Sequence, residues 1–171
     1  MRPVFVGCLL LVCFQCFSQT PEAKLADLGI QLPTIPSPIA SYVHYVKTGN
    51  LIFLAGKGPQ RKEGDYMKGK LGAGLTTEQG YEAARLTGVI QLAVLKEALG
   101  DLSKVKRIVK VTGFVNSDSN YTDHPKVING FSDLMIAVFG DRGRHARTAL
   151  GVAALPMNMA VEVEMVVEVE E

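Results

Sequence analysis

The sequence predicts an α+β domain with the element order β-β-α-β-α-β-β, in which two helices cover one face of a mixed sheet. Short segments rich in β-branched and aromatic residues alternate with two longer segments of helical periodicity, and each helical segment ends at a glycine. The chain has 171 residues, a length that suits one domain and not two.

The sheet is expected to begin with a hairpin over residues 42–55. Aromatic and β-branched residues precede a tight turn at Gly49-Asn50, and a short apolar run follows it. The segment 56–59 ends the hairpin. Residues 60–75 are rich in Gly and Lys and are expected to form a mobile loop.

Two amphipathic helices follow from the apolar periodicity. Thr76 can cap the first helix, with Gln79 three residues later as its partner in a capping box, and Gly100 ends it. Asp123 can cap the second helix, and Gly140 ends that one.

Three further strands are expected, over residues 105–115, from Arg147 onward, and over 160–170. In the last of these, alternation places valines and Met165 on one face and glutamates on the other. Because both helices cover the same side of the sheet, an apolar second side would require an oligomer to bury it.

Arg147 begins the fourth predicted strand, whose period of two places it on one face with Ala149, Gly151 and Ala153. Small residues beside a long cation leave space, which a ligand, a packed helix or a neighbouring subunit can fill. A carboxylate ligand would suit the arginine, because the planar guanidinium makes two parallel charged hydrogen bonds.

Glu162 is the glutamate of the fifth predicted strand that lies nearest the turn at Pro156. If the fourth and fifth strands pair across this turn, Glu162 faces Gly151, and Arg147 lies about 13 Å away along the strand. That gap can hold a small acid. Alternatively, the two groups meet across a subunit boundary.

Residues 1–18 are expected to form a cleaved secretory signal peptide, with a basic start and an apolar core too short to span a bilayer. A buried N-terminal element or lipidation at Cys13 are the alternatives. All three cysteines lie in this segment, so the mature chain would have no thiol, as suits an exported, periplasmic or secreted protein. Residues 19–37 form a Pro-rich arm, and 38–171 the domain.

Charge and motifs argue against several classes of partner. Removal of Arg2 with the leader leaves 17 basic and 17 acidic residues, whereas a nucleic-acid binder usually has a basic excess. The histidines at 44, 124 and 145 are too scattered for a metal motif. His145 can line the same rim as Arg147 or can simply lie at the surface. Phosphate-loop and dinucleotide fingerprints are absent. We therefore expect no cofactor, no metal, no nucleic acid and no membrane attachment after leader cleavage.

Three segments carry a resemblance to a known family: GNLIFLAG at 49–56, VINGFSDL at 127–134 and GRHARTALGVAALP at 143–156. They resemble the RidA/YjgF family, in the subgroup labelled endoribonuclease-like or chorismate-mutase-like, and the resemblance extends over about residues 28–170. It implies a chorismate-mutase-like fold and a barrel-shaped homotrimer with clefts between subunits. It also implies hydrolysis of enamine or imine intermediates to 2-oxo acids and ammonia.

The same resemblance assigns roles to individual residues. Arg147 would bind the carboxylate of a small metabolite, and Glu162 would position water or transfer a proton. Tyr42 would line the cleft from a neighbouring subunit, and Gly56 would offer backbone groups. Ala149 would also line the cleft, at a position where the well-studied deaminases have a cysteine.

The chain also departs from those deaminases at Ala55, where they have a serine. Loss of both the hydroxyl and the thiol changes how the cleft would hold a substrate, so a non-catalytic binding module for small carboxylates on the same trimer is the alternative function. Ribonuclease activity is disfavoured by the zero net charge and by the lack of a histidine paired with a second base in the sequence.

Overall fold

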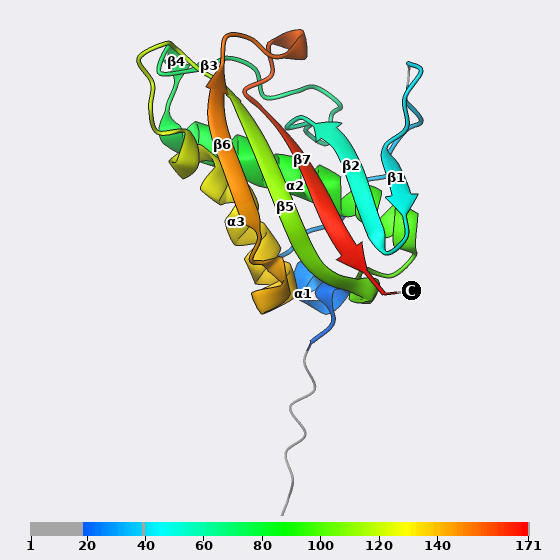
Figure 1. Cartoon of the computed structure of the whole chain (residues 1–171). Helices are drawn as coiled ribbons and strands as arrows, with labels where there is room; N and C mark the ends of the chain where they lie inside the picture. The colour runs from blue at the N-terminus through cyan, green and yellow to red at the C-terminus, as the bar shows by residue number, and fades with distance from the viewer. Residues whose placement is uncertain (1–18, 39, 171) are drawn as a thin grey trace, which may run out of the picture.

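The computed structural model describes residues 19–38 and 40–170 (Figure 1). The predicted signal peptide, with its three cysteines, lies outside the described residues. The helices are α1 (Pro21–Asp27), α2 (Thr77–Leu99) and α3 (His124–Phe139), and the strands are β1 (Tyr45–Thr48), β2 (Leu51–Lys57), β3 (Lys70–Leu71), β4 (Gly74–Leu75), β5 (Val105–Asn116), β6 (Ala146–Val152) and β7 (Val161–Val169).

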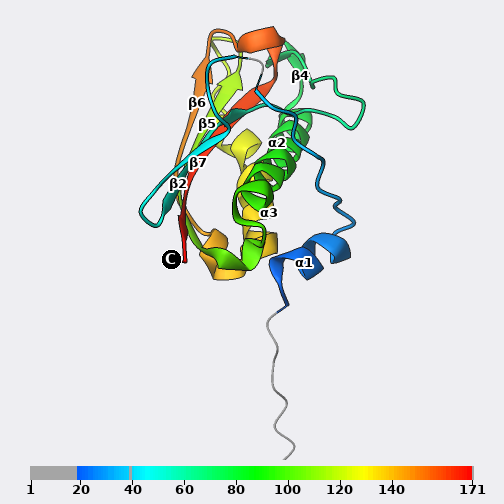
Figure 2. The same cartoon turned by 90° about the vertical axis from the view of Figure 1, so that its right-hand side faces the viewer.

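Five strands form one mixed sheet in the order β1-β2-β7-β5-β6. Strands β5 and β6 are parallel, and every other neighbouring pair in this sheet is antiparallel. Helices α2 and α3 lie against one face, and no helix among the described residues lies on the opposite, open face (Figure 2). The predicted α+β class, the mixed sheet and the two helices on one face are therefore confirmed.

One predicted pairing is wrong: β6 and β7 are not neighbours. Strand β5 lies between them and pairs with both, so that Gly151 is opposite Val115 and Glu162 is opposite Phe114. A short turn can join two strands without making them a hairpin, because the chain can cross to the other side of a strand that is already in place.

The hydrophobic core lies between the sheet and the α2–α3 layer. In β7 the alternate residues at 161, 163, 165, 167 and 169 are all at most 2% exposed, as the sequence pattern predicted. The open face presents partly exposed apolar side chains from four strands: Val46, Phe53, Val109 and Leu150. This face resembles a surface that a second chain would cover.

Local signals account for the bounds of α2 but only partly for those of α3. Thr76 and Gln79 form the predicted capping box, and Gly100 ends α2 with a left-handed φ of 73°. Asp123 occupies the N-cap position of α3 without a side-chain capping bond, because its carboxylate instead pairs with Lys126 at 3.0 Å.

Two segments contain more structure than their composition predicted. Helix α1 lies within the predicted arm, capped by Thr20, with Leu25 buried and Glu22 paired to Lys96 at 2.7 Å. The segment 60–75, expected to be a loop, contains the small β3–β4 sheet, and Leu71 of β3 is fully buried. None of the described helices is long and apolar enough to cross a bilayer.

The crossing of α2 and α3 depends on glycine, which leads to a stability prediction. A methyl group at Gly130 would overlap the backbone carbonyl of Tyr81, whereas one at Gly88 would come to 3.0 Å from a flexible Leu134 side chain. We expect Gly130→Ala to lower the free energy of unfolding by about 1–3 kcal/mol. Gly88→Ala should cost less, since its gain in helix propensity of about 1 kcal/mol is not outweighed by a backbone clash. Urea denaturation would test this, and equal losses would contradict it.

Candidate functional site

Glu162 lies on the open face of the sheet, because the residues on either side of it are fully buried beneath the helices. Its side chain is half-buried and lies directly against Gly56, where a methyl group would overlap the Oε1 atom. Gly56 is part of an irregularity in β2 between Leu54 and Lys57. The absence of a side chain at position 56 thus allows the carboxylate to approach the backbone closely.

Lys57, His44 and Tyr42 extend this group, which we call the Glu162 cluster. The Lys57 Nζ is 2.7 Å from the His44 Nδ1 and 6.0 Å from the centroid of the Tyr42 ring. The His44 Nε2 is 2.8 Å from the carbonyl oxygen of Pro36. A carbonyl can only accept, so Nε2 carries the hydrogen and Nδ1 accepts from the lysine. Tyr42 lies before β1 and is not part of that strand. It is 52% exposed.

Lys57 was not predicted as a site residue, although the sequence contains a signal for it. His44 lies near the start of the hairpin predicted over residues 42–55, and Lys57 follows its end, so the pairing of the two strands brings these residues together. Burial lowers the pKa of Lys57, and the charges of Glu162 and Glu97 oppose this effect. Burial raises the pKa of Glu162, the Glu164 carboxylate adds to the rise, and Lys57 opposes it.

Arg147 lies on the helix face of β6, at the edge of the sheet. Its Nη1 donates to Asn129 Oδ1 at 2.9 Å and to Ser132 Oγ at 3.0 Å, both on α3. Its Nη2 approaches the carbonyl of Pro125 at 3.5 Å. Within the described part of the chain no acidic side chain forms an ion pair with this guanidinium. The guanidinium is therefore oriented by neutral groups and keeps its charge available.

A cavity of about 220 Å³ lies beside the guanidinium, lined by Ser132, Ile136, Arg144, His145 and Arg147. We call it the Arg147 niche. His145 thus lies on the same rim as Arg147, which is one of the two positions considered for it from the sequence. The niche combines two arginines with open space, which is suitable for a small anion.

His145 fixes the serine that holds Arg147. Its Nδ1 is 2.7 Å from the Gly143 carbonyl oxygen, and its Nε2 is 3.0 Å from Ser132 Oγ. Because the carbonyl can only accept, Nδ1 carries the hydrogen, and the Ser132 hydroxyl donates to Nε2 while it accepts from Arg147. Burial lowers the pKa of His145, the charge of Arg147 acts in the same direction, and the bond to Gly143 opposes both.

The structure does not bring Arg147 and Glu162 together within one chain. Arg147 faces α3 on the helix side of the edge strand, whereas Glu162 faces the open side, and β5 separates their strands. The predicted gap between them across a β6–β7 pair therefore does not exist. A meeting of the two groups across a subunit boundary stays a prediction.

The small residues that follow Arg147 are largely explained by packing. Ala149 packs against the hydrophobic core, and a methyl group at Gly151 would overlap His124 Nε2. Core side chains and His124 thus lie against these two positions, and open space remains beside Arg147 itself. The substrate contact assigned to Ala149 stays a prediction.

Comparison with known proteins identifies the family. Residues 22–169 match the family described as "YjgF/chorismate mutase-like, putative endoribonuclease". The chain belongs to this family. The resemblance found in the sequence and the expected chorismate-mutase-like fold are both confirmed.

Within the YjgF/chorismate mutase-like family, the chain is similar to Protein TCP17 of Trypanosoma cruzi, at 46% identity over 85% of this chain and 92% of the relative. It is also similar to 2-iminobutanoate/2-iminopropanoate deaminase of Dermatophagoides farinae, at 28% identity over 82% and 95% of the two chains. The crystal structure of Atu1372 from Agrobacterium tumefaciens, a protein of unknown function, superimposes with a TM-score of 0.82 at 38% identity, covering 89% of this chain and 93% of that one.

The raised pKa of Glu162 predicts how its replacement affects stability. The folded protein holds the proton of Glu162 at a higher pH than the unfolded chain does, so stability is lost as the pH rises through that interval. Glu162→Gln should therefore have a higher Tm than the wild type at about pH 8, and the gain should vanish at about pH 3, below the ordinary glutamate pKa of about 4.3, where the carboxyl is protonated in both states.

Glu168→Gln is the matched control for thermal unfolding at these two pH values. Glu168 lies on the same face of β7 but pairs with Lys106 at 2.7 Å. Its replacement by glutamine should therefore not raise the Tm at about pH 8. A Tm of Glu162→Gln below that of the wild type at this pH would contradict the prediction.

Proposed function

We propose that this protein hydrolyses small enamine or imine intermediates to 2-oxo acids and ammonia, at clefts between the subunits of a homotrimer. The observation that carries the proposal is the half-buried carboxyl of Glu162, held against Gly56 and beside Lys57 with a raised pKa. A carboxyl whose protonated form is favoured by burial can both give and take a proton, which imine hydrolysis requires.

The reaction adds water to a carbon–nitrogen double bond and releases ammonia. In its carboxylate form, Glu162 accepts a proton from the attacking water. In its protonated form, it donates this proton to the imine nitrogen, which gives an amino alcohol. The carboxylate then takes the hydroxyl proton and passes it to the nitrogen, so that the carbon–nitrogen bond breaks, ammonia leaves and the carbonyl of the 2-oxo acid forms. Lys57 lies close enough to stabilise the carboxylate form, so the pair keeps both forms accessible.

Arg147 supplies the second requirement, recognition of the carboxylate that every 2-imino acid carries. Its neutral partners Asn129 and Ser132 orient the guanidinium without neutralising it, and the niche beside it has room for a small acid. A similar relative from Dermatophagoides farinae is named for the deamination of 2-iminobutanoate and 2-iminopropanoate. That name supports 2-imino acids as the substrate class.

The proposal requires a second chain, since Arg147 and Glu162 lie on opposite faces of one sheet. The apolar open face offers a surface for that chain, and the exposed ring of Tyr42 lies at the rim of the Glu162 cluster. In the trimer, each complete site would consist of the Arg147 niche of one subunit and the Glu162 cluster of its neighbour.

The alternative function is a non-catalytic binding module for small carboxylates. It is favoured by one observation: the Arg147 niche is formed by one chain alone, without any contribution from Glu162. A binding module would need only this niche.

Two substitutions separate the functions in assays with 2-iminopropionate and with pyruvate as the stable product. For the enzyme, Glu162→Gln should reduce kcat about 100-fold or more while pyruvate still binds. Arg147→Ala should weaken pyruvate binding about 10- to 100-fold, since it removes charge-assisted hydrogen bonds. Lys126→Ala, which removes an exposed cation of α3, is the control and should change neither quantity.

A wild-type protein that adds nothing to the spontaneous hydrolysis of 2-iminopropionate would rule out the enzyme. If Arg147→Ala then still abolished pyruvate binding, the binding module would stand.

Assembly is tested by a charge on the open face. Phe53 is 45% exposed and is opposite Val46 and Val166 on the neighbouring strands, so Phe53→Glu should leave the monomer folded but place a charge in the proposed interface. We expect a trimer for the wild type and a monomer for Phe53→Glu in light scattering. Lys62→Glu, in the exposed part of the 60–75 segment, is the control. A monomeric wild type would refute the trimer.

A further inference from the structure

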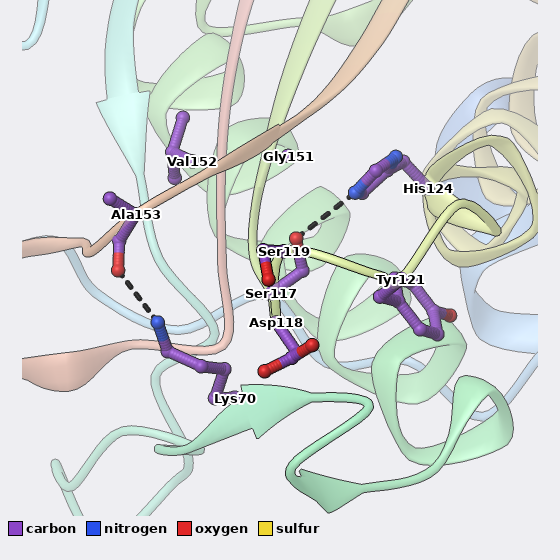
Figure 3. Close-up of a pocket in the computed structure, with 9 residues that line it drawn as sticks. All are labelled: Lys70, Ser117, Asp118, Ser119, Tyr121, His124, Gly151, Val152 and Ala153. Atoms are coloured by element: carbon purple, nitrogen blue, oxygen red, sulfur yellow. Dashed lines mark hydrogen bonds between the residues drawn. The ribbon is translucent and has the colours of Figure 1, made fainter.

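A cavity of about 520 Å³ lies at the ends of β5 and β6, away from both groups described above (Figure 3). Its walls come from three parts of the chain: β3, the segment that joins β5 to α3, and the end of β6. The polar and ionisable side chains of the lining include Ser117, His124, Lys70, Asp118 and Tyr121. This volume is in the range of cavities that bind small molecules.

Ser117 and His124 form a hydrogen-bonded pair in the wall of this cavity. The Ser117 Oγ is 3.0 Å from the His124 Nε2. Ser117 directly follows β5, its side chain is largely buried, and its backbone N–H donates to the carbonyl of Val152. His124 is the first residue of α3. Both groups are thus fixed to regular elements, which is the geometry that nucleophilic catalysis by serine requires.

Gly151 leaves room for this pair of side chains in the cavity wall, because it has no side chain of its own. A methyl group at position 151 would lie 2.6 Å from Ser117 Oγ and would overlap His124 Nε2. The hydroxyl and the imidazole therefore meet over the bare backbone of β6. Any other residue at position 151 would force them apart.

The imidazole is held in place by an aromatic ring instead of a carboxylate. The ring centroids of Tyr121 and His124 are 5.4 Å apart at an angle of 80°, an edge-to-face contact. The Tyr121 hydroxyl in turn is 2.9 Å from Thr77 Oγ1 of α2. Among the described residues, Nδ1 of His124 has no hydrogen-bond partner, so the pair is a dyad without an acid.

We propose that Ser117 and His124 are the nucleophile and the base of an acyl-transfer site that accepts small, polar esters. The Ser117 Oγ attacks the ester carbonyl, and its proton passes to His124 Nε2. The bond from the carbonyl carbon to the leaving oxygen breaks, and that oxygen takes the proton from the imidazole. Water then attacks the acyl-serine with the same base, which releases the acid and restores the hydroxyl.

The charges of the cavity define the substrate class. Lys70 Nζ donates to the carbonyl of Ala153 at 2.7 Å, which fixes the ammonium at the wall and, within the described residues, leaves its other N–H groups open to a ligand. The Asp118 carboxylate lies on the same wall, near Ser117 (Figure 3). A small ester that carries polar groups fits these surroundings better than a long acyl chain does. Since a dyad lacks the acid of a triad, we expect slow turnover and a detectable acyl-enzyme.

This site shares no residue with the Glu162 cluster or the Arg147 niche, so it does not depend on the imine chemistry proposed above. The test uses the purified protein with p-nitrophenyl acetate. Release of p-nitrophenolate measures acylation, and peptide mass spectrometry locates the acetyl group. We expect acetyl on Ser117 in the wild type, none there in Ser117→Ala, and acylation of Ser117 slowed about 100-fold or more in His124→Gln.

Ser103→Ala is the control, because this serine lies at the opposite end of β5 and should leave acylation unchanged. Thermal unfolding of each variant shows whether it is folded, and the position of the acetyl group in the wild type decides even if a variant is not. Acetyl on Lys70 or Tyr121 alone, no acetyl at all, or equal rates for the wild type and His124→Gln would each overturn the proposal.

Discussion

The position of β5 between β6 and β7 is the constraint on which the other features depend. It pairs in parallel with β6 and antiparallel with β7, so α3 must cross over the sheet to join β5 to β6. That crossover makes β6 the edge strand and places α3 directly over Arg147. It also leaves β7 in the interior, where Glu162 meets β2. A single pairing choice thus assigns the cation and the carboxylate to opposite faces.

The sequence predicted where elements lie better than which elements meet. Periodicity and caps located α2 and β7 closely, because these signals are encoded within the segments themselves. The order of strands depends on packing between distant segments, so the expected β6–β7 pair was wrong. Helix α1 escaped notice because it is short and much of its anchoring comes from Lys96 and Leu102, far away in sequence.

For the candidate sites too, the sequence indicated individual residues better than the contacts between them. Arg147 was found from the sequence because it begins a strand of small residues, and Glu162 because it is the glutamate of its strand nearest the turn; the family resemblance assigned a role to each. Their partners were not found, since Asn129, Ser132 and Lys57 are ordinary polar residues until the fold brings them close. Glycines at 56 and 151 gave a usable signal only in the structure, where each accommodates a functional group against bare backbone.

The chain of bonds from Arg147 through Ser132 to His145 makes the guanidinium sensitive to acid. In the neutral imidazole, the serine hydroxyl points its hydrogen at Nε2 and offers its lone pairs to the arginine. A second proton on the ring would reverse that hydroxyl and place a cation near Arg147. Burial keeps the pKa of His145 low and so postpones this change. Acidification would then weaken the hold on the arginine through its serine partner and through the added positive charge, so the order of the guanidinium would depend on the acidity of the surroundings.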